Sequence, residues 1–401
     1  MKKNKIITIL CLILMSVTLM GICGFTVYSF VDKHTISEKE NRKLAQLPEL
    51  NLKNWFSGEF ANGLNLYLND HVLLRNEIIS KASGFENMLK KELPVQVVTS
   101  NDNRKDIGSD AVVLSDKIVA LYINNKDCTE TFIESCNKLF EQMPEHINKY
   151  IMLSPTRIEY ETEDLKQYSN SQLNTIYEVY TRINDDVVKV DAYSPLLLGV
   201  QNAGIDKLYF KTDHHWTAYG ASFGANALLT AMGKNYVNPD LYEKVDFGGF
   251  YGFLAVMYLS DIESIPYDEF IYYNCADNIY EYAYGVEKAD ITECIYEPVI
   301  DPERAGYYAF VERSYQYVVI EGGNKDGGNM LMLNDSYGNA MTPWMASQYN
   351  KIIMIDPRSY EGGADGLMKL IEDYEVDDFV ISFAGLFMSS GNVGNLLELC
   401  K

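Results

Sequence analysis

Short apolar runs alternate with longer amphipathic segments along most of the chain after residue 100. Continuous apolar runs such as 150–154 and 330–333 are typical of buried strands. Intervening segments such as 129–143 and 217–232 have helical spacing of apolar residues or are rich in small residues, as helices are. Strands that alternate with helices at this spacing predict an α/β domain, with a mostly parallel sheet and helices on both faces.

The pattern also predicts where the individual elements lie. Between about 239 and 328 it changes: a glycine- and aromatic-rich loop at 248–252 is followed by tyrosine-, valine- and isoleucine-rich segments. We interpret this part as a β-rich insertion, which either shapes a glycan cleft or only packs on the sheet.

The expected strands are 111–114, 150–154, 187–190, 330–333, 351–355 and 378–382, with antiparallel strands at 270–274 and 307–320. The expected helices are 60–80, 129–143 (N-capped by Thr129), 171–183, 217–232, 339–348 and 366–374.

The first thirty residues have a different pattern. Lys2, Lys3 and Lys5 precede an uncharged apolar run over 6–31, which is long enough to span a bilayer. We therefore expect a cytoplasmic tail (1–5), a transmembrane anchor (6–31), a linker and helical region (32–100) and an extracytoplasmic domain (101–401). The location is then the cell membrane, with a single pass. A cleaved signal peptide is the alternative, and it leaves the domain outside the cytoplasm as well.

The amino-acid composition limits the classes of binding partner. The formal net charge of −22 argues against nucleic acid as a partner and against binding to anionic lipid headgroups. The 30 tyrosines hint at a glycan, because phenol rings stack on sugars and donate hydrogen bonds to them. No zinc-type cysteine spacing occurs, and whether Cys275 and Cys294 pair stays open.

Two segments carry candidate chemistry. Asp213 and His215 are two residues apart, so in extended backbone they point to the same side and the carboxylate orients the imidazole. An Asp–His pair of this kind forms two-thirds of a nucleophilic triad. Ser336 is the candidate for the third member, because it follows the apolar run 330–333 in a tight turn before a predicted helix. There, the helix dipole and free N–H groups stabilise an oxyanion.

The run Asp213-His214-His215-Trp216, followed by Thr217 and Gly220, resembles the DHHW family and, more distantly, the Asp-x-His-Trp block of alginate O-acetyltransferases, which have an SGNH-hydrolase-like domain. The segment 334–338 is similar to the Gly-Asp-Ser block of SGNH enzymes, except that asparagine replaces the glycine. Two rival interpretations of the Asp213 run are a helix N-terminus with surface histidines and a metal-dependent DHH phosphoesterase. The second would need upstream Asp and His ligands that the sequence does not offer in a motif.

The residues and the resemblance together imply an acyltransferase or esterase for O-acyl, chiefly O-acetyl, groups of a cell-surface polysaccharide, without cofactor or metal. Ser336 would attack the ester, His215 would act as base and then acid, and Asp213 would fix the His215 tautomer. A membrane protein that donates the acyl group is a further partner to consider. The alternative is a non-catalytic glycan-binding or assembly protein of the same fold. Candidate substrate-binding residues are Arg358, Tyr337, His214 and Trp216.

Overall fold

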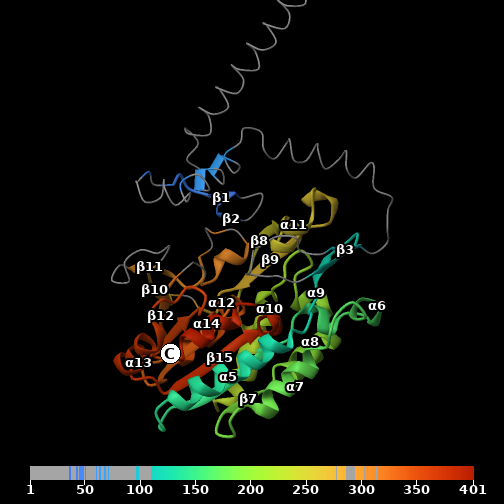
Figure 1. Ribbon diagram of the computed structural model, residues 1–401. Coiled ribbons are helices and arrows are strands. Elements are labelled where there is room, and N and C mark those ends of the chain that lie inside the picture. Colours follow the sequence, from blue (N-terminus) through green and yellow to red (C-terminus); the bar gives the residue numbers. More distant parts are fainter. Residues whose placement is uncertain are drawn as a thin grey trace, which may run out of the picture. The chain divides into compact units, whose positions relative to one another are not determined.

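The computed structural model describes residues 110–401 except 277, 286–293, 302–303, 305 and 312–314, together with short pieces before 110 (36–37, 42–43, 45–48, 50, 60, 63–64, 67–68, 71 and 96–98). The chain divides into two compact units, 1–92 with 259–262 and 93–258 with 263–401. The second unit contains the large sheet and both candidate chemical segments (Figure 1). The predicted anchor over 6–31 lies outside the described residues. Among the helices that are described, none has the length and apolar character needed to cross a membrane.

An eight-stranded mixed sheet forms the centre of the second unit. Its order is β11-β10-β12-β14-β13-β15-β6-β7. The five strands from β14 to β7 run parallel, as predicted, while β12, β10 and β11 add an antiparallel extension. The strands are β6 (Asn148–Ser154), β7 (Val188–Val190), β10 (Tyr280–Tyr284), β11 (Cys294–Pro298), β12 (Tyr317–Glu321), β13 (Asn329–Asn334), β14 (Lys351–Ile355) and β15 (Asp378–Ala384).

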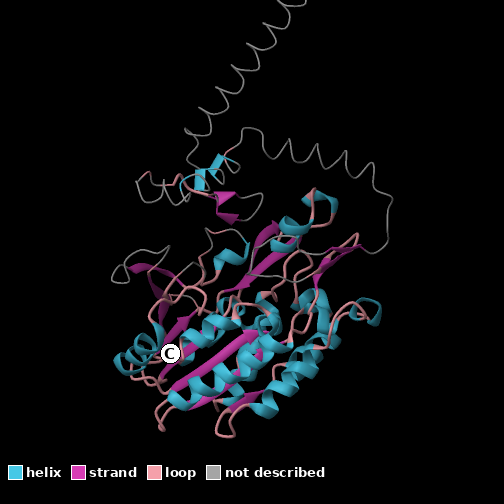
Figure 2. Cartoon of the chain, viewed as in Figure 1, coloured by secondary structure: helices cyan, strands magenta, loops and turns pink. Residues whose placement is uncertain are grey.

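Helices cover both faces of this sheet, which makes the unit a mixed α/β fold (Figure 2). Alternate residues of β13 face opposite layers, so Met330 and Met332 join one apolar core while Leu331 and Leu333 join the other. One layer contains α8 (Tyr193–Ala203), α10 (Ala218–Ala231) and α12 (Tyr337–Met345); the other contains α5 (Lys126–Gln142), α7 (Gln172–Arg182), α13 (Gly363–Asp373) and α14 (Val393–Glu398), and α9 (Ile205–Leu208) and α6 (Glu163–Lys166) are short.

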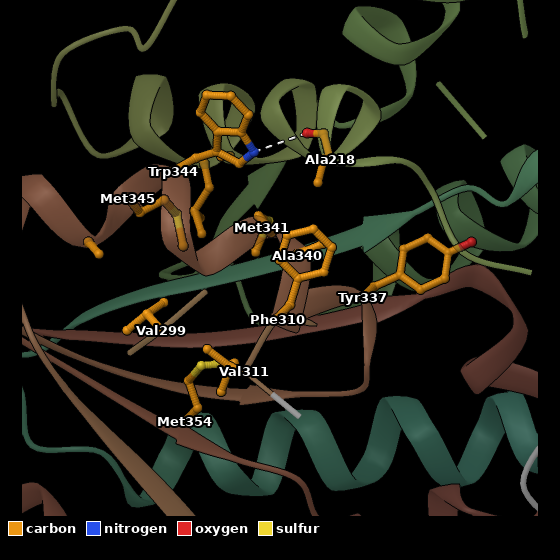
Figure 3. Packing of buried hydrophobic residues seen from close by; sticks show 14 of the residues in the cluster. Ala218, Val299, Phe310, Val311, Tyr337, Ala340, Met341, Trp344, Met345 and Met354 are labelled. Carbon is orange, nitrogen blue, oxygen red and sulfur yellow. Dashed lines mark hydrogen bonds between the residues drawn. The ribbon is translucent and has the colours of Figure 1, made fainter. Parts of the chain in front are cut away.

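Helix α12 packs between the sheet and α10. Figure 3 shows Trp344, Met341 and Ala340 of α12 in the apolar core that also contains Phe310 and Met354. The Trp344 indole N–H donates to the Ala218 carbonyl at 3.0 Å, which ties α12 to the start of α10. Since α10 follows the Asp213 segment and α12 follows Ser336, this packing holds the two candidate chemical segments together.

Several element boundaries differ from the predictions. Helix α5 begins earlier than expected, with Asn125 and not Thr129 as its N-cap, because the Asn125 side chain accepts from two backbone N–H groups. Helix α12 begins at Tyr337, and only residues 317–321 of the predicted strand 307–320 belong to a strand, since 306–309 form a 3-10 helix.

Two predicted parts of the sheet belong elsewhere. Strand β4 (Ala111–Val113) pairs with β3 (Gln96–Val98) and β5 (Ile118–Ala120) in a separate antiparallel sheet. The predicted insertion at 239–328 is only partly separate: β8 (Lys244–Phe250) and β9 (Asp268–Tyr273) pair alone, whereas β10, β11 and β12 extend the central sheet. Helix α11 (Phe253–Tyr258) connects β8 and β9.

Candidate active site

Ser336 lies in the turn between β13 and α12, at the carboxyl edge of the parallel strands. The Asp335 carboxylate fixes this turn by accepting the Tyr337 N–H at 3.0 Å and the Ala384 N–H, at the end of β15, at 2.9 Å. Ser336 occupies the N-cap position of α12, but its side chain makes no capping bond. Its Oγ instead lies 2.7 Å from His215 Nε2, which rules out a simple capping role and confirms that the two segments meet.

The Asp213 segment forms a tight turn and not the extended backbone that we expected. Asp213 Oδ1 accepts both the His215 backbone N–H at 2.9 Å and a hydrogen bond from His215 Nδ1 at 2.6 Å. The predicted contact therefore exists for a different reason, since an Asx-type turn brings the two side chains together. The histidine rings, which extended backbone would separate, lie 3.9 Å apart between centroids.

Trp216 and Tyr337 brace the two segments against each other. The Trp216 indole N–H donates to the Tyr337 carbonyl at 3.2 Å, and the Tyr337 hydroxyl donates to the His214 carbonyl at 2.6 Å. Trp216 is fully buried and Tyr337 is 2% exposed, so these side chains hold the site and have almost no surface to offer a ligand. Burial leaves neither side chain a surface for the substrate-binding role that we listed for both.

The region 239–328 completes the site with residues that the sequence analysis did not single out. The Phe253 N–H donates to Asp213 Oδ2 at 2.7 Å, so each carboxylate oxygen has a partner. Asp268 accepts from both N–H and hydroxyl of Thr212, which anchors the residue before Asp213. Tyr307 stacks on His215 with centroids 3.8 Å apart and an interplanar angle of 10°, and its hydroxyl donates to the Ser336 carbonyl at 2.9 Å.

Burial and charge set the protonation states of this cluster. Burial alone would raise the pKa of Asp213, but the adjacent imidazoles and hydrogen bonds hold that pKa well below its usual range, so the group is a carboxylate. Burial, with help from His215, lowers the pKa of His214 to about 3, so the His214 ring is neutral near pH 7.

The turn after Ser336 offers one backbone donor. The N–H groups of Tyr337 and Gly338 donate to Asp335, whereas within the described chain the Ser336 N–H has no acceptor. Arg358 was a candidate for substrate binding, and its guanidinium is paired with the Asp356 carboxylate, with an Nη2–Oδ2 distance of 2.6 Å. This ion pair gives Arg358 a structural role.

One group of side chains at this site could together offer ligand atoms to a metal ion. Asp213, His214 and His215 offer atoms that all lie within 4.8 Å of one another. The 2.6 Å contact between Asp213 Oδ1 and His215 Nδ1 leaves no room for an ion between these two atoms. Binding a metal through them would therefore break the hydrogen bond that orients His215.

The fold and the site define a mixed α/β protein with a hydrogen-bonded Ser–His–Asp arrangement at the carboxyl edge of its sheet. The chain belongs to the DHHW family, whose model (DHHW protein) matches residues 86–355. A DHHW family protein from Eubacterium siraeum DSM 15702 has a similar structure, with 25% identity, a TM-score of 0.62 and coverage of 72% of this chain and 95% of that one. A search of curated proteins finds no match.

PatB1 from Bacillus cereus also has a similar structure. In its form with a sulfonyl adduct it is 16% identical, with a TM-score of 0.55 and coverage of 71% of this chain and 96% of that one. A second structure of PatB1 is 17% identical, with a TM-score of 0.54 and coverage of 71% and 99%. At this level of identity the likeness concerns the fold.

Proposed function

We propose that this protein is an acyltransferase or esterase that acts on O-acyl groups, chiefly O-acetyl groups, of a cell-surface polysaccharide. The observation that carries the proposal is the continuous contact from Asp213 through His215 to Ser336, with distances of 2.6 and 2.7 Å. A non-catalytic relative of the same fold would have no need for a histidine in hydrogen-bond contact with a half-buried serine hydroxyl. Membership of the DHHW family supports the same assignment.

The reaction begins when Ser336 Oγ attacks the ester carbonyl carbon and its proton passes to His215 Nε2. The oxyanion that forms lies near the Ser336 N–H and the N-terminal end of α12, where the helix dipole favours negative charge. The bond between the carbonyl carbon and the leaving oxygen then breaks. His215 gives its proton to that oxygen, which leaves an acyl group on Ser336.

The second half of the reaction regenerates the serine. A sugar hydroxyl or water attacks the acyl carbon, gives its proton to His215 and takes the acyl group; His215 then returns the proton to Ser336 Oγ. Asp213 keeps Nδ1 protonated and stabilises the imidazolium in both halves. A transferase and an esterase therefore share every residue of the mechanism and differ only in which hydroxyl enters.

The experiment is the intact mass of the protein after brief incubation with 4-nitrophenyl acetate. The wild type should gain one acetyl group, and Ser336→Ala should gain none. Ser389→Ala is a matched control, because Ser389 is a partly buried serine whose hydroxyl bonds to Tyr122, Asn124 and a backbone N–H, away from His215. An adduct that persists in Ser336→Ala would assign the nucleophile elsewhere, and a wild type that never reacts would support the binding protein.

We also propose that residues 6–31 anchor the chain in the cell membrane with its domain outside the cytoplasm. The support is the uncharged apolar run and the three lysines before it. Membrane fractions should contain the intact chain with its N-terminus retained. Recovery of the protein from the medium, starting beyond Val31, would show that the segment is a cleaved signal.

A further inference from the structure

Three tyrosines form a partly exposed aromatic surface at the antiparallel end of the central sheet. Tyr280 and Tyr282 lie on one face of β10, and Tyr296 lies opposite Tyr282 on β11. The Tyr280 and Tyr296 rings are stacked, with centroids 5.0 Å apart and an interplanar angle of 17°, and Tyr282 lies 4.8 Å from Tyr296. Tyr280 is 37% and Tyr296 56% exposed. We call these three residues the tyrosine platform.

The platform extends a sheet face that is covered elsewhere. Further along the same face, Tyr284 stacks on Tyr317 with centroids 4.6 Å apart, and both pack against the apolar core beneath α13. Strands β10 and β11 are the two outermost strands at this end of the sheet (Figure 1). A folded core needs no such exposed row of large rings, and grouped exposed aromatics are typical of binding surfaces.

The tyrosine rings and the paired charges around them indicate which class of ligand the platform would bind. Each ring combines an apolar face with a hydroxyl, which suits the C–H faces and hydroxyls of a sugar. Glu321 faces Tyr280 across β10 and β12, and its carboxylate is neutralised by Lys351 at 2.9 Å, so the adjoining charges are paired. The net charge of −22 disfavours an acidic polymer.

We propose that the tyrosine platform binds a neutral polysaccharide, whose sugar rings stack on Tyr280 and Tyr296. Strand β10 is three strands from β13 in the sheet, and Tyr282 is level with Leu331, five residues before Ser336. The platform is thus roughly 20 Å from Ser336 by strand spacing and rise. A ligand that reaches both must be a polymer. The role of this polymer as acyl acceptor or donor rests on the proposed function. The binding of the polymer to the platform does not depend on that function.

The test is affinity electrophoresis of the full-length protein in gels that contain neutral hydroxyethyl cellulose, laminarin or mannan, or acidic polygalacturonate. We expect retardation by at least one neutral polymer and none by polygalacturonate. Tyr280→Ala/Tyr296→Ala, and to a smaller extent Tyr296→Ala alone, should weaken binding; the double change should cost at least about tenfold, equivalent to roughly 1.4 kcal/mol. Circular dichroism checks that both variants fold.

Two matched controls define the surface. Tyr236→Ala removes a tyrosine that is 67% exposed outside the platform, and Ile295→Ala changes the other face of β11, where the side chain is 42% exposed. Both should bind like the wild type. Unchanged binding by the double variant, equal loss in Ile295→Ala, or a wild type that no neutral polymer retards would each overturn the proposal.

The result is independent of the chemistry at Ser336. Acetylation by 4-nitrophenyl acetate should be the same in the platform variants and the wild type, and Ser336→Ala should still bind the polymer. A wild-type protein that binds a polymer but is not acetylated would therefore refute the proposed function and leave the platform proposal intact. A wild-type protein that is acetylated but binds no polymer would refute the platform proposal and leave the proposed function intact.

Discussion

Replacing Asp213 by asparagine keeps the shape of the side chain and removes its charge. The carboxylate accepts three hydrogen bonds, two from His215 and one from Phe253. An asparagine carbonyl can accept from one side only, and its NH2 group then faces an N–H donor on the other. We therefore expect the amide either to favour the wrong His215 tautomer or to leave the Phe253 N–H without a partner.

The size of the effect follows from the buried contact. An imidazolium and a carboxylate about 4 Å apart attract each other by about 4 kcal/mol at an effective dielectric constant of 20. Losing this in the transition state slows acylation by about three orders of magnitude. Serine enzymes that lose the aspartate of their triad in this way slow by about 10⁴-fold. The unpaired buried donor should also lower the free energy of unfolding by about 1–3 kcal/mol.

The assay is the single-turnover rate of 4-nitrophenol release, with urea unfolding measured in parallel. Asp378→Asn is the matched control, because Asp378 is also a buried carboxylate, 7% exposed, that accepts from Tyr349 and Asn148 at the opposite end of the sheet. The Asp378→Asn variant should unfold at a lower urea concentration than the wild type but release 4-nitrophenol at the same rate. If folded Asp213→Asn acylated within tenfold of the wild type, the assignment of Asp213 would be wrong.

Four other variants probe the same site. His215→Ala should abolish acylation and His214→Ala should retain part of it, as ester kinetics will show; the reverse order would exchange their roles. The pKa of His214 falls to about 3 on folding from an ordinary value near 6.5, so between these values the unfolded state binds more protons and stability falls as pH falls. The decrease in melting temperature from pH 7 to 5 should be smaller in His214→Gln, and an equal decrease would contradict the burial argument. Gly252→Ala would overlap the Asp213 side chain and should slow acylation, whereas Gly391→Ala has open space and should not.

The sequence predicted those parts of the site that depend on short stretches of the chain. The continuous apolar run before Ser336 marks a buried parallel strand, and the turn and helix that follow place the hydroxyl at the carboxyl edge. The proximity of Asp213 and His215 was also predictable, although from the wrong backbone geometry. Two residues that are two apart meet both in a strand and in an Asx-type turn, so the spacing alone did not distinguish them.

The residues that complete the site were not predictable in the same way. Tyr307 stacks on His215, and Phe253 donates to Asp213, from positions that only the tertiary fold brings near. Neither has a motif, and aromatic side chains at such spacing usually pack in cores. The one available signal was the density of glycine and aromatic residues around 248–252, which marks close backbone approach without naming its target.

The region 239–328 therefore contributes to both parts of the proposed activity. Phe253, the first residue of α11, and Tyr307 hold Asp213 and His215 in place, and strands β10 and β11 carry the tyrosine platform. Strand β12, the last of the region, pairs with β14, which pairs in turn with β13 before Ser336. Because one continuous sheet joins the platform to the Ser336 turn, a polymer held on the platform would be fixed in position relative to Ser336. We therefore expect the platform variants to slow reaction with a polysaccharide and to leave reaction with a small ester unchanged.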